Sequence, residues 1–438
     1  MTSYFDSRDN MMSSSATSKY YGRRRQSSPL LPDGVDVIVE SPPFACSIMD
    51  KFLVYASSLV VVGSPIWFYG GIIYLYRKWR HYRELENATA YAAAACSKNS
   101  TASYYNYATS SGESSQESSE KQPPLSQEEI QQSRLDYEKY QRLAKRYCTA
   151  LVAVLVLSIW GPHRSRKVGE FLGVRKWRLW DAWLNYVGYT VLHDKGIVGQ
   201  GETTIPRINN AQVDNDNAIL AFVPHGIFPF ALAFSCLPQR GYEETWGNFH
   251  PVVATATKLF PLVRTFIAWM GGIDASRSAV SSALTNLDSV GIAPGGIAEM
   301  FETYPKPGFH PNDEAFRIRN GIFKLALKHN RPIVPIYCFG ATKMLRRVQL
   351  PTFIENLSRI LKISLCLFFG KLGLPIPFRQ RLMYVIGKTI YPPLDIESGE
   401  VFDQQAQEMH HRFCDEIIRI FENNKEHYGW GNKSIRLV

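Results

Sequence analysis

His225 has the residue type and the position that best fit acid–base chemistry in this chain. It follows the apolar run 218–223 and Pro224, and Gly226 comes directly after it. The run predicts a buried strand that ends at Pro224, and Gly226 permits a tight turn and close approach of a substrate. Because imidazole titrates near neutral pH, a histidine at a strand end can take a proton from a hydroxyl group. The alternative is a histidine that only closes a turn with one hydrogen bond.

A second strand signal also ends in residues that suit a binding site. The apolar run 290–293 is followed by Pro294, Gly295 and Gly296, and Glu299 comes three residues later. Two consecutive glycines let a backbone approach a ligand closely. The segment therefore predicts a strand whose carboxyl end lies at a site.

Two further segments complete the pattern. Arg319 and Gly321 lie at the start of a helix expected over 317–328, and the run 332–340 reads as a buried strand closed by glycine. In chain order the four blocks are Pro-His-Gly, Pro-Gly-Gly-x-x-Glu, Arg-x-Gly-x-x-x-x-Ala and Val-Pro-x-Tyr-x-Phe-Gly.

These blocks resemble the type-2 diacylglycerol acyltransferase family, which includes monoacylglycerol and wax-alcohol acyltransferases. The resemblance extends from about residue 177 to the C terminus. It implies an O-acyltransferase with acyl-CoA as co-substrate, no other cofactor, no metal, and a catalytic domain on the cytosolic side of the endoplasmic reticulum membrane, with lipid droplets as a further location. Many members carry His-Pro-His-Gly, whereas this chain has Val223, so that only His225 inherits the catalytic role.

The resemblance also assigns roles to the residues of these blocks. His225 would act as the general base, and Glu299 would orient its imidazole as a carboxylate does in catalytic triads. A solvated carboxylate at a helix start is the alternative for Glu299. Arg319 would meet the phosphates of CoA or hold the loop in place, with a surface salt bridge as the alternative. The remaining substrate-binding candidates are Pro224, Gly226, Gly295, Gly296 and Gly321.

The class of acyl acceptor is inferred from an arginine that this chain lacks. Acyltransferases that act on phosphorylated glycerol set an arginine after the equivalent strand, and this chain has the glycines described above instead. That difference favours a neutral acceptor such as diacylglycerol, with direct attack of its hydroxyl on the thioester. A monoacylglycerol or a long-chain alcohol is the alternative acceptor. A non-catalytic lipid-droplet or lipid-carrier protein is the alternative from another class.

Composition agrees with an enzyme that works at a membrane. The net charge of +10 suits an anionic membrane surface or the phosphates of CoA. The basic residues are dispersed and no nucleic-acid-binding signature accompanies them, so nucleic acid is not expected as a partner. The 7 cysteines are scattered and predict reduced packing residues. Motifs of serine hydrolases, P-loop enzymes and zinc proteases are absent. A homo-oligomer is among the expected assemblies.

The N-terminal third predicts membrane contact. The uncharged run 52–76 is long enough to span a bilayer, but Gly63 and Pro65 interrupt it, so that a re-entrant hairpin is the alternative. We expect five regions: a disordered tail over 1–45, a membrane segment or re-entrant hairpin over 46–80, a flexible low-complexity linker over 81–127, an amphipathic helix with a second short membrane segment over 128–165, and the acyltransferase catalytic domain over 166–438.

The catalytic part predicts an α/β fold with a central sheet flanked by helices. Apolar runs near 218–223, 289–293, 333–338 and 383–387 predict strands, and helical stretches alternate with them. A closing helix over 401–424 is expected to pack across the sheet. The apolar stretch 361–378 predicts an acyl-chain tunnel or a membrane contact, with ordinary core as the alternative.

Overall fold

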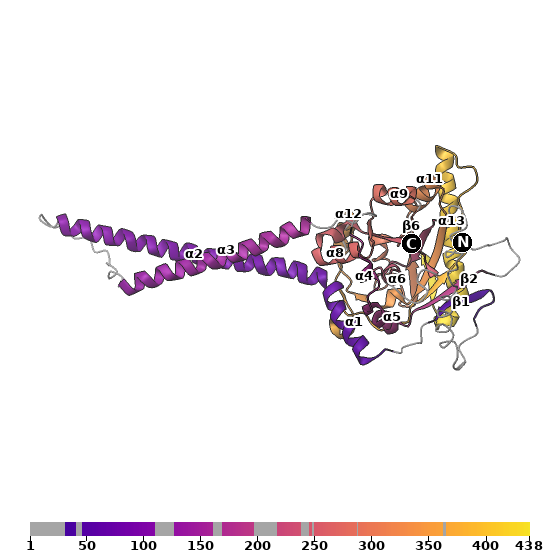
Figure 1. Ribbon diagram of the computed structural model, residues 1–438, viewed down its shortest axis with the longest axis horizontal. Helices are drawn as coiled ribbons and strands as arrows, with labels where there is room; N and C mark the ends of the chain where they lie inside the picture. The colour runs from indigo at the N-terminus through magenta and orange to yellow at the C-terminus, as the bar shows by residue number, and fades with distance from the viewer. Residues whose placement is uncertain are drawn as a thin grey trace, which may run out of the picture.

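An eight-stranded mixed sheet forms the centre of the molecule (Figure 1). The computed structural model describes residues 31–40, 46–109, 127–160, 169–196, 217–237, 245–247, 249–286, 288–361 and 365–438. In spatial order the strands are β1 (Val35–Glu40), β2 (Thr190–Asp194), β11 (Met383–Ile386), β8 (Ile333–Phe339), β3 (Ile219–Val223), β6 (Ser289–Ile292), β4 (Phe249–Val253) and β5 (Ile273–Asp274).

The strands β8, β3, β6, β4 and β5 run parallel to one another. Their carboxyl ends therefore meet at one edge of the sheet, which is the edge where open α/β sheets bind their ligands. β11 is antiparallel to β8, and β1 pairs antiparallel with β2. Two small sheets accompany the large one: β9 (Arg346–Arg347) pairs with β10 (Phe368–Phe369), and β7 (Asp313–Phe316) pairs with β12 (Ser434–Leu437).

Helices cover both faces of the large sheet. Along β3 the side chains alternate, so that Ile219, Ala221 and Val223 join one core and Leu220 and Phe222 join the other. The helices and short 3-10 turns of this part are α4 (Leu172–Arg175), α5 (Leu179–Val187), α6 (Phe230–Ser235), η1 (Thr255–Leu259), α8 (Pro261–Trp269), α9 (Arg277–Thr285), α10 (Gly296–Glu299), α11 (Gly321–His329), η2 (Ala341–Lys343), α12 (Thr352–Leu361), η3 (Lys371–Gly373) and α13 (Glu400–Tyr428).

The first core lies under α9, α11 and α13, and the second lies under α5 and α6. The strands expected near 218–223, 289–293, 333–338 and 383–387 are confirmed as β3, β6, β8 and β11, and the helix expected over 401–424 is confirmed as α13. The α/β class with a central sheet flanked by helices is likewise confirmed. The stretch 361–378 divides: Ile376 is buried, whereas Leu367 and Leu372 are exposed.

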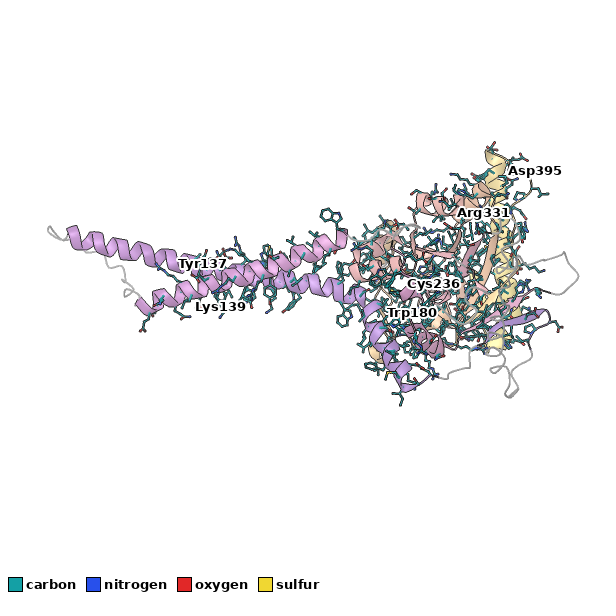
Figure 2. All side chains as sticks on the ribbon, viewed as in Figure 1. Tyr137, Lys139, Trp180, Cys236, Arg331 and Asp395 are labelled. Carbon is teal, nitrogen blue, oxygen red and sulfur yellow. The ribbon has the colours of Figure 1, made fainter. Side chains whose placement is uncertain are left out.

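Three helices precede this part: α1 (Ile48–Val61), α2 (Ser64–Thr109) and α3 (Gln127–Ile159). The helices α2 and α3 form a long hairpin that projects from one side of the sheet-bearing part (Figure 1). Figure 2 places Tyr137 and Lys139 on this projection and Trp180 and Cys236 within the sheet-bearing part. Among the described residues, no helix taken singly has the length and apolarity to cross a membrane; α1 and the first part of α2 pass that test as a pair bent by 51°.

Two expectations about this region were wrong. Residues 35–40 are not disordered, because β1 pairs with β2 along the edge of the sheet; residues 1–30 and 41–45 lie outside the described residues. The expected linker begins as helix, since α2 continues to Thr109. The stretch 81–109 is rich in alanine and holds neither glycine nor proline, and such a composition favours a helix. Residues 110–126 of the expected linker lie outside the described residues.

α3 is a single helix across the expected junction between an amphipathic and an apolar segment. Tyr82 of α2 stacks on Tyr147 of α3 with ring centroids 5.4 Å apart. At the C-terminal end of α3, the buried Arg264 of α8 donates hydrogen bonds to the carbonyls of Leu157 and Trp160, each at 2.8 Å, and to the Ser158 carbonyl at 3.1 Å. Since the last carbonyls of a helix lack partners within the helix, this arginine caps α3 and joins it to the sheet-bearing part.

Candidate active site

Three loops that follow parallel strands converge at the carboxyl edge of the sheet. The loop after β3 carries His225, the loop after β6 leads into α10 with Glu299, and η2 follows β8. The backbone N–H of His225 donates to Glu299 Oε1 at 2.8 Å. A Cβ built on Gly226 would lie 3.7 Å from the Ala341 carbonyl oxygen of η2. Pro224 ends β3 as expected and sets the start of the turn that presents His225.

The turn after β3 also fixes the tautomer of His225. Gly226 has φ +65°, a conformation that favours glycine, and its carbonyl oxygen lies 2.8 Å from His225 Nδ1. Because a carbonyl oxygen only accepts hydrogen bonds, the proton of the neutral ring is placed on Nδ1. His225 Nε2 is then left with its lone pair, which is the form that a general base requires.

The surroundings keep this ring neutral. Burial lowers the pKa of His225 below its usual value, and the positive charge of Arg319 lowers it further, while the hydrogen bond to Gly226 acts in the opposite direction. A lowered pKa leaves the imidazole unprotonated at neutral pH. His225 therefore holds the protonation state and the tautomer of a base without help from a carboxylate.

Glu299 does not orient the imidazole, which corrects the role expected for it. Its carboxyl group accepts a hydrogen bond from the backbone N–H of His225 and not from the imidazole ring. Nor is it solvated at a helix start, because its exposed fraction is 1%. Burial raises the pKa of Glu299 to about 8, against the backbone N–H groups of His225 and Arg317. Glu299 is therefore mostly protonated at neutral pH and positions the backbone of the turn.

The two consecutive glycines of this loop differ in what they do. A Cβ on Gly295 would stand 1.5 Å from Glu299 Oε2 and 2.5 Å from the Arg317 carbonyl oxygen. Gly295 is thus needed to admit the carboxyl group, and the space beside it is filled by the protein. Gly296 has φ +57° and no described atom within 4 Å of an added Cβ, so a ligand can approach it.

The remaining predicted residues lie between β7 and α11. Arg319 is exposed, and within the described parts of the chain it forms no ion pair, so the expected surface salt bridge is not found there. Its positive charge lowers the pKa of His225. Gly321 begins α11 on an open surface, with no described atom within 4 Å of an added Cβ.

Val223 stands where the family resemblance led us to expect a histidine. Its side chain is fully buried in the core under α11 and α13. It contributes packing at the end of β3, and His225 is the histidine that the turn brings forward.

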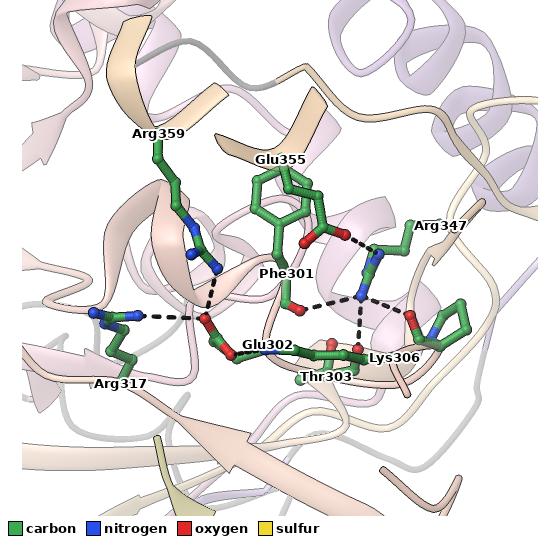
Figure 3. Close-up of polar contacts among 9 residues, drawn as sticks. Phe301, Glu302, Thr303, Lys306, Arg317, Arg347, Glu355 and Arg359 are labelled. Carbon is green, nitrogen blue, oxygen red and sulfur yellow. Dashed lines mark hydrogen bonds and ion pairs between the residues drawn. The ribbon is translucent and has the colours of Figure 1, made fainter. Parts of the chain in front are cut away.

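A charged network beside the site was missed by the sequence analysis (Figure 3). Glu302, one turn beyond Glu299, is approached by Lys306, by Arg317 at 3.3 Å and by Arg359 at 2.9 Å. Glu302 and Lys306 are four residues apart in the sequence and pair across a turn that is not helical. The two arginines are 15 and 57 residues away, and no local pattern connects them with Glu302.

Among the residues that the structure describes, no group of three histidine, cysteine, aspartate or glutamate side chains is placed to hold a metal ion.

The sequence of the chain is similar to those of known acyltransferases. A family model described as diacylglycerol acyltransferase matches residues 149–438. The chain is 25% identical to acyl-CoA wax alcohol acyltransferase 1 of Mus musculus, over 59% of this chain and 77% of that protein. It is 26% identical to diacylglycerol O-acyltransferase 2-like protein 6 of Homo sapiens, over 62% and 80%. It is also 26% identical to 2-acylglycerol O-acyltransferase 1 of Mus musculus, over 49% and 67%.

Among solved structures, the chain is similar to the 1-acyl-sn-glycerophosphate acyltransferase PlsC from Thermotoga maritima. The identity is 12% and the TM-score 0.30, over 56% of this chain and 78% of that one.

Proposed function

The chain belongs to the diacylglycerol acyltransferase family, and from this membership we propose that it transfers the acyl group of acyl-CoA to the free hydroxyl of diacylglycerol to form triacylglycerol. It is an acyl-CoA-dependent O-acyltransferase, so the alternative of a non-catalytic lipid carrier is set aside. The single observation that carries the mechanism is the contact between His225 Nδ1 and the Gly226 carbonyl, since it leaves Nε2 free to act as a base.

The reaction proceeds by direct attack. The acceptor hydroxyl donates to His225 Nε2, its oxygen bonds to the thioester carbonyl carbon, and its proton passes to Nε2. The tetrahedral intermediate then expels the CoA thiolate, which recovers the proton from the imidazolium. Holding the two substrates against each other at the edge of the sheet supplies much of the rate enhancement. The step needs no acyl-enzyme.

Two features support a neutral acceptor. The loop after β6 presents Gly296, with an open approach, where a phosphate-binding side chain is absent. The three sequence relatives named above are, by their names, acyltransferases of wax alcohol, diacylglycerol and 2-acylglycerol, which carry no phosphate. Monoacylglycerol and long-chain alcohols remain the alternative acceptors, because proteins with those names match the chain as well as a diacylglycerol-type relative does.

A membrane is the proposed source of the acceptor. The helix α12 turns its polar side inward, where Glu355 and Ser358 are buried, and leaves Phe353 and Ile360 exposed at 68% and 76%. Apolar residues that face outward from a helix held by polar contacts suit a lipid surface. α12, α8 and α1 lie on the side from which the α2–α3 hairpin projects (Figure 1). The endoplasmic reticulum and lipid droplets stay predictions for the location.

The test is a reconstituted assay with labelled acyl-CoA and liposomes that contain diacylglycerol, monoacylglycerol, a long-chain alcohol or lysophosphatidate. We expect product from diacylglycerol, none from lysophosphatidate, and a loss of at least about 10²-fold in His225→Ala. The matched control is His411→Ala, which removes an exposed histidine of α13. Unchanged product in His225→Ala, with an unchanged melting temperature, would remove His225 from the chemistry. Preferential use of another acceptor would replace diacylglycerol as the substrate.

A further inference from the structure

The network around Glu302 holds more positive charge than its structural task requires. One carboxylate, with a side chain 6% exposed, is approached by Lys306, Arg317 and Arg359, whose side chains are 28%, 41% and 35% exposed (Figure 3). Three cations and one carboxylate leave a net charge of two, and Arg319 nearby adds a third. We name these four basic residues together with Glu302 the Glu302 cluster.

A neighbouring arginine shows what a purely structural cation looks like in this fold. The side chain of Arg347 is 2% exposed, and it pairs with Glu355 and donates to the carbonyls of Phe301, Thr303 and Pro305. Its charge is compensated, and both of its terminal nitrogens donate to protein oxygens. It joins the loop that follows α10 to β9 and α12.

The cations of the Glu302 cluster differ in both respects. Arg317 and Arg359 each direct one nitrogen to Glu302, and a guanidinium has five N–H donors. The rest of each fork is half-exposed and available to an anion. Guanidinium forks match phosphate oxygens in geometry and form charge-assisted hydrogen bonds with them.

The cluster lies one helical turn from the catalytic turn. The backbone N–H of Glu302 donates to the Glu299 carbonyl at 2.9 Å, and the Glu299 carboxyl group contacts the backbone of His225. Arg317 packs with its carbonyl oxygen beside Gly295, and Arg319 follows it toward the ring of His225. The cluster and His225 are thus joined through Glu299 and its hydrogen bonds.

We propose that the Glu302 cluster binds the phosphate groups of the CoA moiety of the acyl donor. This inference rests on the proposed function, because it takes acyl-CoA as the donor at His225. In acyl-CoA the pantetheine arm separates the thioester from the phosphates, so the phosphates must be bound at a distance from the base. Glu302 holds the cations in place, and the incoming phosphates supply the negative charge that the cluster lacks.

The proposal is tested by calorimetry of CoA binding to the full chain in a neutral detergent. Arg359→Gln and Lys306→Gln each leave Glu302 with two cations, so the carboxylate stays paired. We expect each change to weaken CoA binding about tenfold, with a smaller dependence on salt. Pantetheine, which lacks the phosphates, should bind all variants equally. The matched control is Arg412→Gln, which removes an exposed arginine of α13, a helix at the opposite side of the sheet-bearing part from α12 (Figure 1).

Steady-state kinetics give a second readout. Arg359→Gln should raise KM for acyl-CoA about tenfold with little change in kcat, because binding of the phosphates is uniform through the reaction. Arg359→Lys, which keeps the charge and loses the fork, should lie between the wild type and Arg359→Gln. The proposal is overturned if both glutamine variants bind CoA as the wild type does.

A second experiment distinguishes the phosphates of CoA from the phosphate headgroups of lipids as the ligand of the cluster. If the variants lose binding to phosphatidate vesicles and keep their affinity for CoA, the cluster serves lipid headgroups and the proposal fails. His225→Ala should lose turnover and still bind CoA through the cluster. If the wild type turns over no acceptor while the cluster variants still weaken CoA binding, the proposed function fails and the cluster assignment stands.

Discussion

The role of Glu299 gives the most direct test of the catalytic turn. The structure makes it a neutral group that accepts a hydrogen bond from the backbone of His225, with a pKa raised to about 8 by burial. Glu299→Gln keeps a carbonyl oxygen for that N–H and removes the ionisable group. The substitution should therefore preserve the turn and alter the pH dependence of stability.

The magnitude follows from the pKa. Folding raises the pKa of Glu299 from 4.5 to about 8. As the pH rises, the unfolded chain loses this proton at a lower pH than the folded chain does. The contribution of Glu299 to the free energy of unfolding is therefore complete below about pH 4.5 and falls as the pH rises to about 8. One pKa unit corresponds to 1.36 kcal/mol, which makes the loss about 2 kcal/mol at pH 6 and about 5 kcal/mol above pH 8. In Glu299→Gln this loss is absent.

Denaturant unfolding at pH 6 and pH 8.5, with acyltransfer measured on the same samples, tests whether Glu299 is a neutral group that only positions the backbone. The free energy of unfolding of Glu299→Gln minus that of the wild type should grow by about 3 kcal/mol between the two pH values. The variant should keep kcat within about tenfold, whereas the change from carboxylate to amide in a catalytic triad lowers kcat about 10⁴-fold. Glu299→Ala leaves the His225 N–H without an acceptor at a cost of about 1–3 kcal/mol and should lower kcat. A triad-sized loss of kcat in Glu299→Gln, without a pH-dependent gain in stability, would refute our account.

Three further predictions follow from the same geometry. Gly295→Ala should lower the free energy of unfolding by about 3 kcal/mol, because its Cβ would overlap the Glu299 carboxyl group; Gly321→Ala, in open space on a helix, should raise it by about 0.5–1 kcal/mol, and thermal melts compare the two. The kcat of the wild type should fall only as the pH drops below the usual range for histidine, and Arg319→Gln should move this fall to higher pH, since a charge that lowers the pKa of His225 is removed; an unmoved profile would separate Arg319 from the ring. Arg264→Met should speed hydrogen exchange at the C-terminal end of α3, where its three carbonyl contacts are lost, at a cost of about 2–4 kcal/mol; unchanged exchange there would contradict the capping role.

The strands that carry the site were predictable because each is short, apolar and ended by proline or glycine. β3 shows this best: the run 218–223 is buried on both faces and stops at Pro224, which delivers His225 to the edge of the sheet. The parallel order of β8, β3, β6 and β4 was not predictable, since it depends on contacts between segments that are far apart in the chain. β1 was missed for the same reason, because its partner β2 is about 150 residues away.

The hydrogen-bond partner of Glu299 could not be predicted from the sequence. A glutamate three residues after two glycines fits a solvated helix start, an orienting carboxylate or a buried acceptor equally well. What decides between them is the space beside Gly295, which admits the carboxyl group and excludes water. Only the packed loops create that space. The four residues of Pro-Gly-Gly-x-x-Glu indicate a site. Whether the glutamate accepts from the backbone N–H of His225 or from its ring depends on how the loops pack.

A neutral Glu299 also makes sense of the charges around the reaction. An ionised carboxylate behind His225 would raise the pKa of the imidazole and favour its protonated form. With Glu299 protonated, Arg319 is the charged side chain that acts on the pKa of the ring. Negative charge develops on the thioester oxygen and then on the departing thiolate, and fixed positive charge stabilises both. The burial that raises the pKa of Glu299 therefore serves the base and the anionic intermediate together, which is why Glu299→Gln should be tolerated and Glu299→Ala should not.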